Sequence, residues 1–411
     1  MSAVVASPTL GVESLDPVRA LQHALYRAAK ADPGRRFHAL HDKVHRRDVL
    51  ARAWWLVRRN SGAAGIDHIT IAEVKEYGVA RLLDELAAEL QAGRFRPLPA
   101  RRVFIPKPGS AEQRPLSIPT IRDRVVQAAV KIVIEPIFEA DFLPCSFGFR
   151  PKRSAHDALQ VLVDESFQGK RWVVETDVAN CFEAIPHSGL MSAVEERVSD
   201  RRLLGLLRAF LRAGVMLEGT VRRAVTGTPQ GGVVSPLLAN VYLHRLDRAW
   251  RGAYGTPVRY ADDLVVLCRS QGQAVAALAR LTSLLADLGL QPKQAKTRIV
   301  HLTDGGEGLD FLGFHHRLVH SRACAWNRPS HLPRPLAIAQ GDAACPGPHP
   351  VHDDAGPVGC AGRASRAGYE SVPARLGGVL PIRELSPGVR QDPQLRGDAA
   401  RAFRGETSST S

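Results

Sequence analysis

Apolar side chains recur at helical spacing in several stretches of the chain. This spacing predicts helices over residues 18–30, 80–92 and 122–134. Pro136 is expected to limit the third helix, because proline removes a backbone donor. Residues 273–288 predict a fourth, amphipathic helix. Its apolar stripe is expected to consist of Val275, Leu278, Leu281, Leu285 and Leu288.

Shorter apolar runs, rich in β-branched residues, predict strands. They occupy residues 101–105, 115–118, 171–178, 258–260 and 264–267. The first two flank a basic turn at 107–114, which predicts a hairpin with a cationic tip. The last two flank Ala261, Asp262 and Asp263 and predict a second, tighter hairpin.

The pattern changes after residue 319. Residues 321–411 hold 11 Pro and 11 Gly in 91 positions, and no helical or strand period persists there. A Pro and Gly content near one quarter is typical of poorly ordered sequence. We therefore predict no fold for residues 320–411.

Composition places the chain among globular proteins with a polyanionic partner. Of its 411 residues, 45% are hydrophobic and 23% are charged, which excludes fibrous chains and chains disordered throughout. The formal net charge is +14, and nucleic acid is the commonest partner of such a basic protein. The alternative is a coding bias toward Arg and Ala.

The sequence also indicates a compartment. No apolar run reaches the length of about 18 residues that a membrane helix needs, so no membrane partner is expected. Residues 1–16 carry no Lys or Arg and do not resemble a signal peptide. The six cysteines form no CxxC pair, which argues against a zinc site or a disulfide framework. We expect a soluble, cytoplasmic protein.

Three aspartates are the sharpest chemical signal. Asp262 and Asp263 are adjacent in a turn between buried strands, and Asp177 ends another apolar strand. Like charges so close are costly unless a cation neutralises them, and Mg²⁺ prefers carboxylate oxygens. Taken singly, the pair is explained equally well as a solvated turn, and Asp177 as the cap of a strand end. Together, they predict a site for two Mg²⁺ ions of the kind that promotes in-line transfer of a nucleotide.

Nine short motifs then occur in a fixed order and carry a resemblance to a known family. They are FIPKP (104–108), RPLSIP (114–119), DRVVQ (123–127), EPIF (135–138), SFGFRP (146–151), GTPQGG (227–232), SP (235–236), YADD (260–263) and FLGF (311–314). In this order they closely resemble the reverse transcriptases encoded by bacterial group II introns. The resemblance covers roughly residues 18–319.

The resemblance implies an α+β fold, a right-hand polymerase with fingers and a ferredoxin-like palm. It divides the chain into an N-terminal extension with a basic helical segment, fingers, a palm with the catalytic aspartates and primer grip, and a remainder where the family has a helical thumb. These parts are residues 1–59, 60–165, 166–319 and 320–411. Because the last part shows no helical repeat, the thumb is expected to be absent or degenerate, and a frameshift is one hypothesis for its origin.

The matching motifs also imply roles for single residues. Asp177, Asp262 and Asp263 match the metal ligands, with the Val178 carbonyl as a helper. Lys296 resembles the lysine that protonates the leaving pyrophosphate, although Lys293 stands nearby in the sequence.

Other motifs match residues that hold the substrates. Lys107 and Arg114 match the pair that grips the triphosphate, and a solvated basic loop is the alternative. Phe182 matches the bulky residue that blocks a ribose 2′-hydroxyl, and Gln230 matches a residue that lies against the incoming nucleotide. The ordinary alternatives are core packing for Phe182 and a tight bend for the turn of Gln230. The match to the primer grip consists of Phe311, Leu312, Gly313 and Phe314.

The function that the resemblance implies is RNA-directed DNA synthesis for a group II intron, with an ancestral role in splicing and mobility. Its partners would be an RNA template, the intron RNA, a DNA primer or target, and dNTPs. One alternative is an RNA-binding splicing cofactor, or maturase, with little polymerase activity, although such a protein has no reason to keep three clustered acids. Another is a reverse transcriptase of a non-intron class, such as a retron or a phage-defence enzyme.

Overall fold

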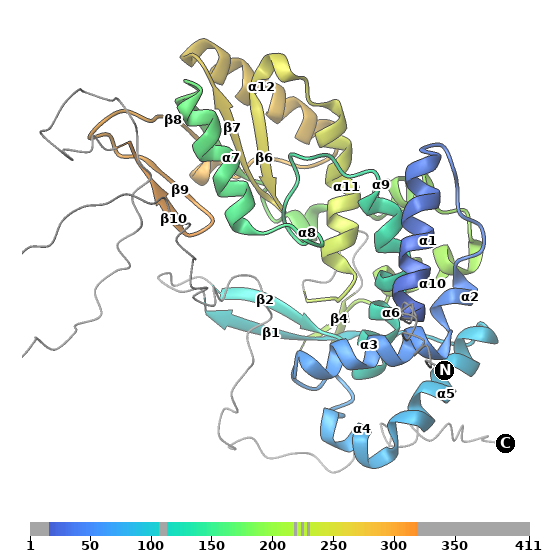
Figure 1. The fold of residues 1–411 in the computed structure, drawn as a ribbon. Coiled ribbons are helices and arrows are strands. Elements are labelled where there is room, and N and C mark those ends of the chain that lie inside the picture. Colours follow the sequence, from blue (N-terminus) through green and yellow to red (C-terminus); the bar gives the residue numbers. More distant parts are fainter. Residues whose placement is uncertain (1–15, 107–112, 218–219, 223–225, 228–230, 319–411) are drawn as a thin grey trace, which may run out of the picture.

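The computed structural model describes residues 16–106, 113–217, 220–222, 226–227 and 231–318 (Figure 1). The predictions for Lys107, Gln230 and residues 320–411 lie outside the described residues.

Helices dominate the N-terminal part of the described chain. They are α1 (Pro17–Ala31), α2 (His41–Val44), α3 (Arg47–Arg59), α4 (Ile71–Tyr77) and α5 (Val79–Gln91). Helix α1 begins where the Asp16 side chain accepts the backbone N–H of Val18, with Pro17 in the first turn. The predicted helices at 18–30 and 80–92 are thereby confirmed as α1 and α5.

Helix α6 (Ile121–Glu139) is longer than predicted, because it continues through Pro136. Our expectation that Pro136 limits this helix is wrong. Proline leaves the carbonyl four residues earlier, on Ile132, without its helical donor. The Gln22 side chain of α1 donates to this carbonyl at 3.2 Å. A neighbouring helix therefore supplies the hydrogen bond that the proline removes.

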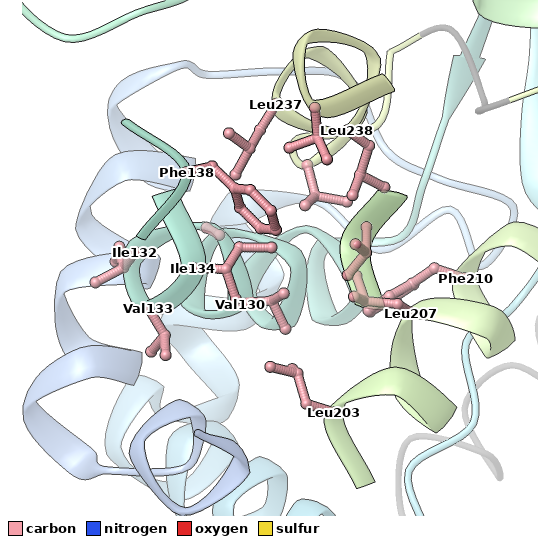
Figure 2. Packing of buried hydrophobic residues seen from close by; sticks show 14 of the residues in the cluster. Val130, Ile132, Val133, Ile134, Phe138, Leu203, Leu207, Phe210, Leu237 and Leu238 are labelled. Carbon is pink, nitrogen blue, oxygen red and sulfur yellow. The ribbon is translucent and has the colours of Figure 1, made fainter. Parts of the chain in front are cut away.

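Helix α6 is buried on nearly all sides and forms the centre of the largest hydrophobic core. The helices that join it there include α8 (Cys181–Ala184), α9 (His187–Glu195), α10 (Arg201–Arg212) and α11 (Ser235–Ala249). Figure 2 shows Val130, Ile134 and Phe138 of α6 among side chains of α10 and α11, including Leu207 and Leu238.

A first sheet has the strand order β2-β1-β4-β5. Its strands are β1 (Ala100–Pro106), β2 (Gln113–Ile118), β4 (Val215–Leu217) and β5 (Thr220–Arg222). Strands β1 and β2 are antiparallel, with Ile105 opposite Arg114, so the predicted hairpin is confirmed. Strand β4 joins β1 in parallel and was not predicted.

A second sheet, antiparallel throughout, has the order β6-β7-β3-β8. Its strands are β3 (Trp172–Asp177), β6 (Thr256–Tyr260), β7 (Asp263–Cys268) and β8 (Arg298–His301). Helix α7 (Ala155–Phe167) packs against one face, with Val173 and Val265, while α12 (Gln271–Asp287) packs against the other, with Val174 and Val266. Because both faces are covered, the strands are apolar at successive positions, as the sequence shows.

The apolar stripe of α12 differs from the predicted one. Val275 is 54% exposed, and Leu278 and Leu288 are only partly buried. The small side chains of Ala274 and Ala277 take the central places against β3 and β7. Sequence analysis favoured the larger residues, whereas the structure buries the face that allows the closer approach to the sheet. The buried positions are Ala274, Ala277, Leu281, Leu284 and Leu285.

Smaller elements complete the described chain. They are the 3-10 helices η1 (Gly252–Tyr254) and η2 (Gln294–Lys296) and the hairpin of β9 (Leu309–Phe311) and β10 (Phe314–His316). Within the described ranges, no helix has the length and apolar character needed to cross a membrane.

Candidate active site

The structure places the three predicted aspartates together at one end of the second sheet. Asp177, the last residue of β3, lies directly opposite Asp263, the first residue of β7. Asp262 belongs to the turn that joins β6 to β7, and its carbonyl accepts the backbone N–H of Val178 at 3.1 Å. The backbone that carries the acids is therefore fixed by strand pairing.

The alternation of the two strands explains why these side chains share a face. In a strand, every second residue points to the same side. Asp177 thus lies on the side of Val173, and Asp263 on the side of Val265, which is the face that packs with α7. Asp177 and Asp263 therefore lie at the edge of the apolar core that Val173 and Val265 help to form.

The charged forms of the aspartates are disfavoured by burial and by repulsion between the carboxylates. Burial raises the pKa of Asp262, and the charge of Asp177 raises it further. Burial, a hydrogen bond to Asp177 and repulsion from Asp177 and Asp262 together raise the pKa of Asp263 to about 8. A cation bound among these groups would relieve the repulsion and favour the charged forms.

Lys296 supplies one cation at this site. Its ammonium, carried by η2, forms an ion pair with the Asp177 carboxylate. The hydrogen bond to Asp177 raises the pKa of Lys296, so the ammonium stays protonated at neutral pH. Lys293, the neighbouring candidate, contributes its backbone N–H to the Asp177 carbonyl at 2.8 Å.

An open cavity of about 730 Å³ lies in front of Asp177 and Asp263, and Asp262 is not among the residues that line it. Its lining includes Arg114, Asp177, Tyr260, Asp263, Lys296 and Phe311. Arg114 comes from β2 of the first sheet, and its charge lowers the pKa of Asp262 against the effect of burial. Residues from both sheets therefore line the same cavity.

The donor set fits a divalent cation in chemistry, although its arrangement is not that of a closed metal site. Three carboxylates lie close together, their mutual repulsion is only partly offset by Lys296 and Arg114, and the Lys296 ammonium lies beside Asp177. Among the described residues, no group of three or more His, Cys, Asp or Glu side chains is arranged so that it could hold a metal ion in this structure. A bound cation would thus compete with Lys296 for Asp177.

The predicted primer-grip residues form the tip of the β9–β10 hairpin. Phe311 pairs with Phe314, and the two-residue turn between them has φ of 55° at Leu312 and 79° at Gly313. Two successive positive φ values are typical of a type I′ turn. Phe311, Leu312 and Gly313 line the cavity, while the Phe314 ring lies 5.9 Å from the His156 ring.

Other predicted residues have different surroundings. Phe182, in α8, is partly buried against the main core. It is not among the residues that line the cavity, so its predicted contact with a nucleotide stays a prediction. Val178 is buried and pairs with Pro292 in an isolated bridge, and the role of its carbonyl also stays a prediction.

Sequence analysis missed Arg259, which stands two residues before the turn of the aspartates. Its side chain is completely buried and donates to the Ala261 carbonyl at 3.0 Å. The available signal was a charged residue inside a short strand whose neighbours are apolar. Glu175 and Arg298 were also missed; they line the cavity as an ion pair at 2.7 Å.

Comparison with known proteins settles the family. Residues 105–316 match the family model described as reverse transcriptase (RNA-dependent DNA polymerase). This chain belongs to the reverse transcriptase family. The match contains the whole second sheet with all three aspartates, and the first sheet apart from most of β1. It confirms the predicted α+β fold with a palm-type sheet.

Within this family the chain is of the group II intron type. It is 36% identical over 236 residues to the group II intron-encoded protein LtrA of Lactococcus lactis, covering 57% of this chain and 39% of LtrA. It is also 35% identical over 347 residues to Protein YkfC of Escherichia coli, covering 74% of this chain and 88% of YkfC. The chain thus spans most of YkfC but well under half of LtrA.

A comparison of structures gives a more distant match. The partial Cas6-RT-Cas1--Cas2 complex aligns with a TM-score of 0.39 and 21% sequence identity. The alignment covers 62% of this chain and 49% of that chain.

Proposed function

We propose that this reverse transcriptase is an active RNA-directed DNA polymerase, which extends a primer 3′-hydroxyl with dNTPs on an RNA template. The observation that carries the proposal is the pairing of Asp177 with Asp263 across β3 and β7, with Asp262 in the adjoining turn. A protein that only binds RNA gains nothing from holding together three partly buried acids whose charges repel one another.

The three aspartates would hold two Mg²⁺ ions, with the Val178 carbonyl as a further ligand. When bound, such ions lower the pKa of a hydroxyl nucleophile and neutralise charge on a leaving pyrophosphate. The contribution of the chain is to hold its carboxylates at fixed positions on paired strands, so that little reorganisation accompanies each turnover.

Basic residues around the cavity would hold and protonate the substrate. Arg114 projects from the rim, where a guanidinium can bind two phosphate oxygens at once. Lys107 would extend the same grip, and Gln230 and Phe182 would contact the nucleotide. Lys296, which is protonated beside Asp177 in this structure, would donate its proton to the leaving pyrophosphate.

The remaining assignments concern larger parts of the chain. We propose that residues 60–165 act as fingers and residues 166–319 as the palm, with the N-terminal extension, residues 1–59, before them. The turn of Phe311, Leu312, Gly313 and Phe314 faces the same cavity as the acids and would position the primer end. The resemblance places a thumb after the primer grip, and in this sequence residues 320–411 follow that point.

Intron RNA is the proposed second partner. The relative LtrA is named as a group II intron-encoded protein, and the net charge of +14 suits a folded RNA. A splicing role would use basic residues that contact RNA and not the aspartates, so the two functions are separable by mutation.

Primer extension on an RNA template with dNTPs and Mg²⁺ tests the polymerase proposal. D262A is expected to lower nucleotide incorporation at least about a thousandfold, because the lost carboxylate would hold a cation that stabilises negative charge in the transition state. D164A, which removes an exposed aspartate on α7, is the matched control and is expected to keep wild-type activity. A folded wild-type protein that incorporates no dNTP would refute polymerase activity and favour the maturase alternative.

A further inference from the structure

Arg259 is buried without any exposed surface, and every donor of its guanidinium is used. Nε and Nη2 donate to the two carboxylate oxygens of Asp247 at 2.8 and 2.6 Å. Nη1 donates to Asn240 Oδ1 at 2.9 Å and to the Ala261 carbonyl at 3.0 Å, and Nη2 also donates to Ser146 Oγ at 2.8 Å. Arginine has five such donors, and all five are satisfied here.

The charge of this arginine is neutralised locally. Asp247, in α11, is as deeply buried as Arg259 and binds it through both oxygens. The pair therefore adds little net field at the catalytic acids. The contribution of Arg259 to the turn is a hydrogen-bond donor in a fixed position, which binds the Ala261 carbonyl.

The Ala261 carbonyl belongs to a residue whose backbone conformation is unfavourable. Ala261 has φ of 59°, in the left-handed region that a residue with a Cβ rarely adopts. Such a conformation costs roughly 1–2 kcal/mol and persists where surrounding contacts impose it. Since Ala261 directly precedes Asp262, its backbone conformation sets the direction of the turn that carries the acids.

The same network holds the turn against the segment at residues 146–148. Backbone N–H groups of Phe147 and Arg259 bond across to Arg259 and Cys145, each at 2.8 Å. A Cβ on Gly148 would lie only 2.4 Å from the Ala261 nitrogen, so the two backbones are in direct contact. Asn240 donates to the Gly148 carbonyl at 2.7 Å and thereby links that segment to Arg259.

We propose that Arg259 is a positioning residue for the polymerase reaction. Its guanidinium joins α11, the 146–148 segment and the Ala261 carbonyl, and so fixes the direction in which Asp262 and Asp263 leave the turn. The inference rests on the proposed polymerase function. It differs from a role in stability alone, because it predicts a defect in turnover and in cation binding while the protein is folded.

The substitution R259K separates the two roles. Lysine keeps the charge beside Asp247, but its single ammonium has three donors and cannot span the five acceptors. R197K is the matched control. Arg197 is also buried and paired with an aspartate, Asp141, at 3.0 Å, and its partners among the described residues do not include the turn.

Two readouts are compared at a temperature where both variants are fully folded by circular dichroism. The first is single-nucleotide incorporation, with kcat and the KM for dNTP measured separately. The second is Mn²⁺ binding, followed through the EPR signal of the free ion, which needs no turnover. R259K is expected to lower kcat about 10- to 100-fold with little change in KM, and to weaken Mn²⁺ binding. R197K is expected to match the wild type in both.

A wild-type kcat and Mn²⁺ affinity in R259K would overturn the proposal, as would equal losses in R197K. If the wild type itself incorporates no nucleotide, the polymerase function fails, and Arg259 is then judged by Mn²⁺ binding alone. Should R259K not fold, N240A takes its place. N240A removes one acceptor of Arg259 and the link to Gly148. Its kcat and Mn²⁺ binding then test the proposal in the same way.

Discussion

Asp123 shows how burial acts on a single residue outside the cavity. The carboxylate is 2% exposed and accepts the Thr120 hydroxyl at 2.8 Å and the Leu98 N–H at 3.2 Å. Burial nevertheless raises the pKa of Asp123 to about 7, from an ordinary value of 3.8. The hydrogen bonds lower the pKa, but they do not offset the loss of water around the charge.

The sign of the pH dependence follows from this raised pKa. Between about pH 4 and pH 7 the folded protein holds a proton on Asp123 that the unfolded chain has released, so stability falls as pH rises through this window. D123N keeps an oxygen acceptor and carries no charge, so this loss should disappear. At pH 8 the variant is expected to be more stable than the wild type, with an upper bound of about 4 kcal/mol.

Urea unfolding of both proteins between pH 4 and pH 8 measures this difference. The free energies of unfolding should coincide near pH 4 and separate toward pH 8. D164N, at an exposed position, serves as the control for the change in net charge. Parallel curves for D123N and the wild type would show that Asp123 is already charged at pH 4 in the folded state.

At the scale of elements, α6 depends on a side chain from another helix. The Ile132 carbonyl lacks a helical donor because residue 136 is proline, and Gln22 of α1 supplies one. Q22A is expected to cost about 1 kcal/mol of the free energy of unfolding, the usual net value of such a bond. In a P136A background the backbone N–H of residue 136 satisfies the carbonyl, so the same change should cost much less.

A double-mutant cycle measured by urea unfolding checks this coupling. The four proteins are the wild type, Q22A, P136A and the double variant. The coupling free energy between the two positions should be clearly different from zero. Additive effects would mean that the Gln22 side chain contributes through packing on α1 and not through the carbonyl.

Local pattern was sufficient to predict the elements that carry the acids. Residues 171–178 and 258–267 are short, apolar and bounded by turn residues, and they form β3, β6 and β7 in the structure. Their register follows from the two-residue turn, which sets Tyr260 opposite Asp263. The hairpin at 101–118 was predictable because two short apolar runs flank a basic turn there.

Features that depend on contacts between distant segments were not predictable from local pattern. The continuation of α6 past Pro136 is supported by a hydrogen bond from Gln22, more than 100 residues away. The stripe of α12 is set by the small space beside the sheet, which favours Ala277 over Val275. A charged residue in a short apolar strand marks Arg259 as unusual, but its acceptors come from three segments, so the sequence around it does not indicate its role.

At the scale of the whole molecule, the main quantity is charge. The full chain carries a net charge of +14, and some arginines of its described part are already held in ion pairs. Arg298 pairs with Glu175, and Arg102 with Glu183. Binding of nucleic acid must therefore draw on the remaining basic residues, each of which releases a counterion when it meets a phosphate.

This account predicts a steep salt dependence of binding. Neutralising about five phosphates of a single-stranded RNA gives a slope near −3.5 in a plot of log affinity against log salt, which weakens binding about a hundredfold between 50 and 200 mM. Fluorescence anisotropy of a labelled single-stranded RNA measures the slope directly. A peptide nucleic acid of the same sequence, which has no phosphates, is the control and should bind with little salt dependence. If the RNA affinity is also flat in salt, the positive charge reflects the Arg-rich composition of the chain, and recognition depends on contacts with bases or sugars.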